Sequence, residues 1–384
     1  MYSWEDLAAL ALARQFPDLP GRDVDSVAEA LHLIGPIQAQ TARAPFLGLA
    51  ARMPGVTLQT ISAAYGAHRI VRGSNIRGTV HTSTPEDSPL LEVATRLGQR
   101  TLWQRTLKLQ RTTLEDVWAG IEEFARDDWR TPAELSAHLV AWLAEHDPDA
   151  GAALDNDAGR YFGFGHGGLV RRPLKGGWQA QGAPGYRTAS AVLGDRQAVL
   201  ADPDAAIDAL LLRHVESHGP SSRHDLSWWA GVGLRVVDAS LARLADRLTD
   251  EAGPDGRTYY DLAGDPGQAP APTPSSGLPE GVRLLPEFDA LFCGYEPKAR
   301  ARFVTPEHHT RLWVSSNGMI PALLLVDGRV TGFWRMPGSG ARRPCEVSWF
   351  AGTRRPTKSE LAEPVNAVEA AYGVTVTELT VSRA

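Results

Sequence analysis

Cysteine is scarce in this chain, with only Cys293 and Cys345 among 384 residues. Two cysteines cannot build a cysteine-rich zinc site, and they do not form the disulfide framework of a small secreted protein. Long apolar runs are also lacking, because no stretch approaches the roughly 18 residues of a membrane-spanning helix. Glu5 and Asp6 stand where a signal peptide would carry positive charge. We therefore expect a cytoplasmic globular protein without a membrane segment.

Basic residues are outnumbered overall, at 39 Lys and Arg against 45 Asp and Glu, which gives a net charge of −6. This balance argues against DNA, whose affinity comes largely from neutralised phosphates. The charges are segregated, however. Basic residues outnumber acidic ones by ten to three over 35–111, four to none over 161–187 and eleven to four over 294–358, whereas 112–160 holds three and twelve. The basic blocks could form a positive face or be ordinary solvated surface.

Helical patterns followed by hairpin patterns recur three times, with a period near 100 residues. In the first copy, apolar spacing near 3.6 predicts helices over 3–16, 24–33 and 58–66, and strand alternation predicts a hairpin over 68–84. Its turn is predicted at Gly73-Ser74-Asn75. Helices followed by a hairpin are the order of a winged helix. The sequence therefore predicts an α+β fold of tandem winged helix-turn-helix domains.

Capping signals support the helices of the later copies. Thr131 precedes Pro132 as an N-cap would, and Ser221 or Ser222 can cap a helix that carries Asp225 in its first turn. These signals place the helices of the second and third copies.

The C-terminal hundred residues are β-rich, with a hairpin turn at Asp327-Gly328, and follow a Pro, Gly and Ser-rich linker at 264–281. The predicted domains are a first winged helix at 1–110, a second at 111–190, a third at 200–265 and a C-terminal β-rich portion at 282–384.

A short motif and four longer segments carry a family resemblance. The motif is Gln38-Ala39-Gln40, and the segments are 76–87, 219–232, 284–295 and 317–335. They resemble the winged-helix DNA glycosylases of the AlkZ/YcaQ type, which remove bulky or crosslinking alkyl adducts from DNA. The motif looks like the catalytic Gln-hydrophobic-Gln motif of that family. Gln40, where the YcaQ-like branch has an acidic residue, is similar to the AlkZ-like branch, and Ala39 is smaller than the usual apolar residue.

Two carboxamides suit the chemistry that this resemblance implies. A guanine alkylated at N7 is already cationic, so its release needs little help to the leaving group. Each glutamine offers one acceptor oxygen and two donor hydrogens, which can orient a water. We expect Gln38 and Gln40 to position the hydrolytic water and to contact the deoxyribose. The alternative is that both are polar residues of a turn between helices.

Basic and polar side chains on the two predicted hairpins, together with Arg43 beside the motif, are candidates for DNA contact. Such contacts position a protein on DNA without reading its sequence. The candidates are Arg43, Arg69, Arg72, Asn75, Arg77, His81, Arg171, Arg172 and Lys175. Surface solvation is the alternative for each arginine, and satisfaction of buried backbone groups is the alternative for His81.

The combined interpretation is a monofunctional DNA glycosylase with a C-shaped DNA-binding surface. We expect it to excise bulky or crosslinking N7-alkylguanine adducts from double-stranded DNA as a nucleoid-associated monomer, in repair or in self-resistance to a genotoxin. No amine nucleophile stands out, so it should leave an abasic site uncut, and no metal or cofactor is implied. The alternative is a non-enzymatic winged-helix regulator or a drug-sequestering resistance protein. Few residues in the candidate recognition helices can read bases, which disfavours a regulator.

Overall fold

The computed structural model describes residues 1–151, 154, 157–264, 278–312 and 318–384. The predicted linker at 264–281 falls mostly outside these residues. Within them, helices and strands alternate as the sequence predicts, and the mixed α and β architecture is confirmed.

The first unit places the Gln38-Ala39-Gln40 motif between helices. Its elements are α1 (Trp4–Gln15), α2 (Val24–Ile34), β1 (Ile37–Gln38), α3 (Ala44–Arg52), α4 (Leu58–Gly66), β2 (Val71–Asn75), the 3-10 turn η1 (Ile76–Gly78) and β3 (Thr79–Ser83). Helix α2 ends where Gly35 takes a φ of 81°, and Pro36 then favours extended backbone. The predicted turn at Gly73-Ser74-Asn75 is wrong, because these residues pair with β3 and the chain reverses at η1 instead.

A long helix that the sequence analysis did not predict, α5 (Ser88–Leu107), follows β3 within the predicted first domain. The second unit comprises α6 (Leu114–Phe124), α7 (Pro132–His146), α8 (Asp157–Arg160), the 3-10 turn η2 (Tyr161–Gly163), β4 (Leu169–Pro173) and β5 (Pro184–Thr188). Thr131 caps α7 as predicted, in a capping box with Glu134. Strand β4 pairs with β2, so the hairpins of the first two units form one sheet in the order β1-β3-β2-β4-β5.

The third unit has the element order expected of a winged helix, with a short strand before its second helix. It follows α9 (Ala189–Leu193) and α10 (Gln197–Leu200), and its elements are α11 (Pro203–His218), β6 (Ser221–Ser222), α12 (Arg223–Ala230), α13 (Leu234–Arg243), β7 (Leu248–Ala252) and β8 (Thr258–Leu262). Ser222 caps α12 through a capping box with Asp225. The apolar core of this unit also includes Ile76 of η1 and Leu91 of α5. The first hairpin is therefore packed against the third unit.

The C-terminal portion is built on a second five-stranded sheet, ordered β13-β12-β11-β10-β9. Its elements are β9 (Val282–Leu284), α14 (Ala290–Cys293), the 3-10 turn η3 (Ala299–Arg302), α15 (Pro306–Leu312), β10 (Ala322–Val326), β11 (Arg329–Arg335), β12 (Arg342–Trp349), α16 (Ala362–Tyr372) and β13 (Thr375–Arg383). The predicted turn at Asp327-Gly328 joins β10 and β11. Ala8 and Leu12 of α1 lie in the same apolar cluster as Phe292, so the N-terminal helix and the C-terminal portion share a core.

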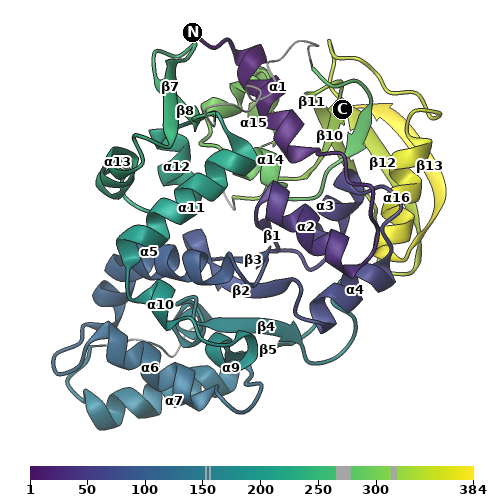
Figure 1. Cartoon of the computed structure of the whole chain (residues 1–384). Helices are drawn as coiled ribbons and strands as arrows, with labels where there is room; N and C mark the ends of the chain where they lie inside the picture. Colours follow the sequence, from purple (N-terminus) through teal and green to yellow (C-terminus); the bar gives the residue numbers. More distant parts are fainter. Residues whose placement is uncertain (152–153, 155–156, 265–277, 313–317) are drawn as a thin grey trace.

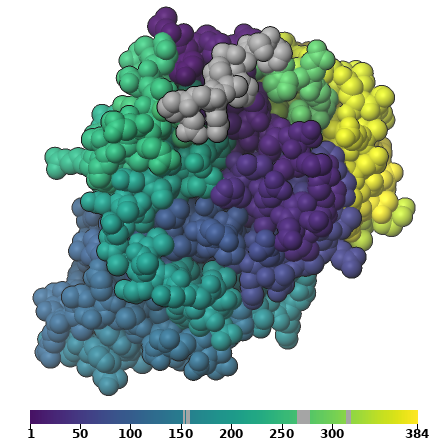
Figure 2. Space-filling view, in the orientation of Figure 1, coloured from purple at the N-terminus to yellow at the C-terminus, as the bar shows by residue number. Residues whose placement is uncertain are grey.

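Figure 1 shows the second unit below, the third unit at the upper left and the C-terminal portion at the right, with the β1-β3-β2 strands at the centre. In Figure 2 the purple N-terminal residues lie between the teal third unit and the yellow C-terminal portion. No helix among the described residues is long and apolar enough to cross a membrane. Strand β1, which carries Gln38, thus lies in the sheet at the centre of the molecule.

Candidate active site and nucleic-acid interface

Gln38 is held by the sheet at the centre of the molecule. It pairs across β1 and β3 with His81, and the amide of the next residue, Ala39, donates to the carbonyl of Val80 at 2.6 Å. Residues opposite one another on antiparallel strands project from the same face. Gln38 and His81 are 7% and 2% exposed, so the first glutamine of the motif lies in a largely dry environment.

An arginine from the first hairpin fixes the carboxamide of Gln38. The Nη2 of Arg77 donates to the Oε1 of Gln38 at 3.3 Å, and its Nη1 donates to the carbonyl of Trp229 near the end of α12. Burial, reinforced by the positive charge of Arg77, lowers the pKa of His81 to about 3. His81 is therefore neutral at physiological pH, and Arg77 is the charged group beside the motif.

Gln40 lies just beyond β1 and is exposed. It lines an open groove of about 670 Å³, which we call the glutamine groove. The groove also contains Arg43, Gln179, Gln181, Arg343 and Tyr372, so it lies between the motif, the β4–β5 loop and the C-terminal portion. Its lining, as far as the structure describes it, holds two arginines and no carboxylate. Arg43 is paired with Glu287, which lies behind the lining, and Arg343 donates to the carbonyls of Gly340 and Ser339.

A second hollow of about 630 Å³ holds most of the basic residues of the β4–β5 hairpin, and we call it the arginine cleft. Arg72, Arg171, Arg172 and Arg187 line it, again with no carboxylate among the lining residues that the structure places. A small depression lies between the two hollows. Its lining residues include Arg171 and Arg172, which also line the arginine cleft, and Gln181, which also lines the glutamine groove. The two hollows therefore form one basic track that leads away from Gln40.

Two of the candidates for DNA contact, Arg171 and Arg172, line this track, and a third, Lys175, lies beside it. Arg171 lies over the ring of Tyr186 at 5.8 Å and Arg172 over that of Trp129 at 4.2 Å, and Lys175 is exposed in the adjoining loop. Within the described residues no carboxylate pairs with any of the three. Their charges are thus available to phosphates.

Other candidates are engaged within the protein. Arg43 pairs with Glu287 of the C-terminal portion, and Arg69 pairs with Asp25 at 2.9 Å on the surface. The side chains that are buried are Arg72, Asn75 and His81, at 5%, 3% and 2% exposure. These three side chains therefore lie in the protein interior. The structure thus brings Gln38, Arg77 and His81 together, whereas Arg171 and Arg172 line the arginine cleft.

The sequence analysis missed several residues around the motif. Gln181 accepts a hydrogen bond from the amide of Ala42 at 3.2 Å, and Glu287 accepts one from the hydroxyl of Thr41 at 3.5 Å. Glu287 lies inside the segment 284–295, which was noted for its resemblance alone. No signal in the sequence pointed to Gln181, because its partner is 139 positions away.

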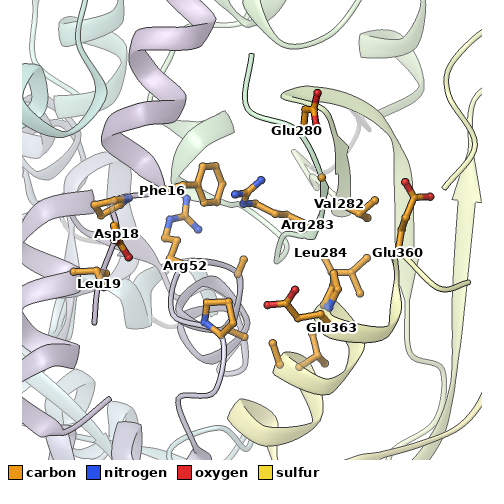
Figure 3. Close-up of a pocket in the computed structure, with 18 of the residues that line it drawn as sticks. Phe16, Asp18, Leu19, Arg52, Glu280, Val282, Arg283, Leu284, Glu360 and Glu363 are labelled. Carbon is orange, nitrogen blue, oxygen red and sulfur yellow. The ribbon is translucent and has the colours of Figure 1, made fainter. Parts of the chain in front are cut away.

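A third hollow, of about 550 Å³, lies away from the motif, between the α1–α2 connection, β9 and α16. Figure 3 shows Arg52 and Arg283 on either side of the Phe16 ring, with Glu363 directed into the space. The guanidinium of Arg52 is paired with Asp289 at 2.9 Å. Acidic and basic side chains are mixed here, so this hollow does not suit a run of phosphates.

Metal ligands are not clustered in the part of the chain that the structure describes. No group of three or more His, Cys, Asp and Glu residues there could hold a metal ion. His308 and His309, the adjacent pair in the sequence, lie in α15, and the ring of His308 stacks on Phe350.

Comparisons with known proteins identify the fold and the family. No curated protein sequence matches the chain. Among solved structures, the DNA glycosylase AlkZ of Streptomyces sahachiroi superposes with a TM-score of 0.79, covering 99% of both chains at 19% sequence identity, and so shares the fold. A family model described as DNA glycosylase AlkZ-like matches residues 31–371, which include Gln38 and Gln40. The chain therefore belongs to the AlkZ-like DNA glycosylase family.

Proposed function

We propose that this protein is a monofunctional DNA glycosylase that excises bulky or crosslinking N7-alkylguanine adducts from double-stranded DNA. The observation that carries the proposal is the pair of glutamines at the head of a basic track, one buried with its carboxamide held by Arg77 and one exposed in the glutamine groove. A member of a DNA glycosylase family needs a site of this kind for the sugar and a basic path for the backbone.

The chemistry follows from the cationic leaving group. Release of an N7-alkylguanine turns the base neutral and moves positive charge onto the deoxyribose, so the enzyme must orient a water and support an oxocarbenium-like sugar. Gln38 presents its amide nitrogen while Arg77 occupies its oxygen, and Gln40 presents a complete carboxamide. Together they can hold the water and the sugar without a proton donor of matched pKa.

The same residues support the expectation that the strand is left uncut. A lyase needs an amine nucleophile to form a Schiff base with the sugar. The glutamine groove has no lysine among the lining residues that the structure describes. The open shape of the groove also suits a bulky or crosslinked base that cannot rotate into a closed pocket.

We expect the protein to act as a monomer beside the nucleoid in the cytoplasm, in repair or in self-resistance to a genotoxin.

The test is excision of a defined N7-alkylguanine adduct from duplex DNA by the wild type and by the Gln38→Ala, Gln40→Ala double variant. We expect the wild type to release the base and leave an alkali-labile site, and the double variant to lose about 100-fold or more of the rate. Gln197→Ala, an exposed glutamine of α10, is the matched control and should keep the wild-type rate. A wild type that binds DNA but leaves simple and bulky adducts intact would favour the regulator instead.

A further inference from the structure

Arg77 occupies an unusual backbone position next to the motif. It lies in η1 with a φ of 58°, a left-handed conformation that side chains other than glycine rarely adopt. The following residue, Gly78, has a φ of 69°. The two left-handed residues reverse the chain between β2 and β3, and the reversal brings the guanidinium of Arg77 to Gln38. Strain of this kind persists where the surroundings hold the residue in place.

The guanidinium of Arg77 is engaged with neutral oxygens on two different units. Nη2 donates to Gln38, and Nη1 donates to the carbonyl of Trp229, in the last turn of α12. Carbonyls in the last turn of a helix lack helical partners and carry partial negative charge, so a cationic donor is favourable there. No carboxylate pairs with Arg77 among the residues that the structure describes. Its hydrogen bonds therefore connect the motif to the third unit.

This contact sets the orientation of the Gln38 carboxamide. A carboxamide can be rotated by 180° with little change in shape, and its orientation is set by its hydrogen bonds. With Oε1 turned to Arg77, the Nε2 amide of Gln38 is the end left for the substrate. A charged donor on the oxygen also polarises the carboxamide and makes its N–H groups stronger donors.

We propose that Arg77 is a positioning residue of the glycosylase, which sets the orientation of Gln38 and ties it to the end of α12, and that it does not act as a phosphate contact. This inference rests on the proposed function. It differs from the sequence expectation, which grouped Arg77 with the DNA-contacting arginines. The two roles make different demands, because a phosphate contact changes affinity and salt dependence whereas a positioning residue changes the rate of the bound complex.

The experiment compares Arg77→Met with Arg171→Met on the same adducted duplex. Single-turnover rates at saturating protein give the rate of the bound complex, and titrations at several salt concentrations give Kd and its salt slope. We expect Arg77→Met to slow excision by at least about 10-fold with Kd and the salt slope unchanged. Arg171→Met should weaken binding and reduce the slope of log K against log salt by about 0.9. Loss of affinity and slope in Arg77→Met, at an unchanged rate, would overturn the proposal.

A double-mutant cycle with Gln38→Ala tests whether Arg77 acts through Gln38. If it does, Arg77→Met should have no further effect on the rate in the Gln38→Ala protein, whereas independent roles would multiply. Arg77→Lys, which keeps the charge but not the fork of two donors, replaces Arg77→Met if thermal unfolding shows that the latter does not fold. A wild type without excision would reject the proposed function itself, whereas an active wild type with multiplying effects would reject only the role of Arg77.

Discussion

Arg72 illustrates how burial decides the role of a single basic residue. Its guanidinium donates to the carbonyls of Ala42 and Trp178 at 3.3 and 3.2 Å and to the Tyr65 hydroxyl at 3.0 Å, and it lies 5.0 Å from the centre of the Tyr65 ring. The Tyr65 and Trp178 rings stack at 4.3 Å. Arg72 thereby fixes the β4–β5 loop against the segment that follows the motif.

We predict that Arg72→Met destabilises the protein by about 2–3 kcal/mol, because it leaves buried acceptors without donors. The free energy of unfolding, from urea titration, measures the effect. Arg69→Met is the matched control, since Arg69 is an exposed partner of Asp25 and should cost no more than about 0.5 kcal/mol. Equal losses in the two variants would show that the contacts of Arg72 contribute nothing beyond a surface arginine.

Single residues of the site were predictable only in part. Gln38 and Gln40 are identifiable because the motif resembles that of a family, while the residues alone allowed a structural turn. The link from Arg77 to Trp229 was not predictable, because the donor and the acceptor are 152 positions apart and meet only through folding. Arg77 also stood among several similar arginines, and nothing in a sequence shows which arginine makes internal hydrogen bonds.

At the scale of elements, the β4–β5 hairpin carries Arg171 and Arg172 in the arginine cleft and Lys175 in the adjoining loop. We predict that replacing Arg171, Arg172 and Lys175 together by Met weakens DNA binding and lowers the salt slope by up to about 2.7, since each phosphate that is no longer neutralised lowers it by about 0.9. Binding to undamaged duplex should weaken as much as binding to adducted duplex, because phosphate contacts carry no sequence or lesion information. Fluorescence anisotropy across a salt series measures both.

The control for the hairpin variant is Arg235→Met, in α13 of the third unit. Arg235 lines none of the hollows described. An unchanged salt slope in the hairpin variant would show that DNA follows another path.

The elements with strong local signals were predicted well. The caps at Thr131 and Ser222 each satisfy the start of a helix by contacts within a few residues, so the sequence contains them. Helices α3 and α5 were missed, since neither has a side-chain cap at its start. The joining of two hairpins into one sheet rests on pairing of Gly73 with Val170, and such distant pairing leaves no local pattern. The domain boundaries at 110, 190 and 282 remain predictions.

The whole molecule is held together by buried polar groups where its units meet. The rings of His214 and His218 on α11 stack at 4.7 Å, and the His218 Nε2 lies 3.2 Å from the carbonyl of Ala290 in the C-terminal portion. The hydroxyl of Tyr295 donates to the carbonyl of His218. The third unit and the C-terminal portion are therefore joined around two histidines that are fully buried.

These histidines make the stability of the whole chain depend on pH. Burial lowers the pKa of His218 to about 3, and burial, followed by the charges of His218, Arg302 and Arg77, lowers the pKa of His214 well below 6.5. The pKa of His81 is also lowered, again chiefly by burial. The unfolded chain then binds protons below pH 6.5 before the folded protein does. The contribution of these histidines to stability is complete above pH 6.5 and falls as the pH drops.

We predict that the free energy of unfolding falls between pH 6.5 and pH 5, with each buried histidine contributing up to about 1.4 kcal/mol per pH unit. Urea titrations at fixed ionic strength from pH 5 to pH 8 measure this slope. His214→Phe keeps a ring between His218 and Trp229. It should reduce the slope by up to about 1.4 kcal/mol per pH unit, which corresponds to one proton. Burial raises the pKa of Asp225, so Asp225 changes stability with pH in the direction opposite to the histidines. Both proteins contain Asp225, so the slope of the wild type minus the slope of His214→Phe isolates the contribution of His214. His146→Phe, at the exposed end of α7, is the control for the loss of a histidine. If the wild type and His214→Phe have the same slope, folding does not keep the His214 ring neutral.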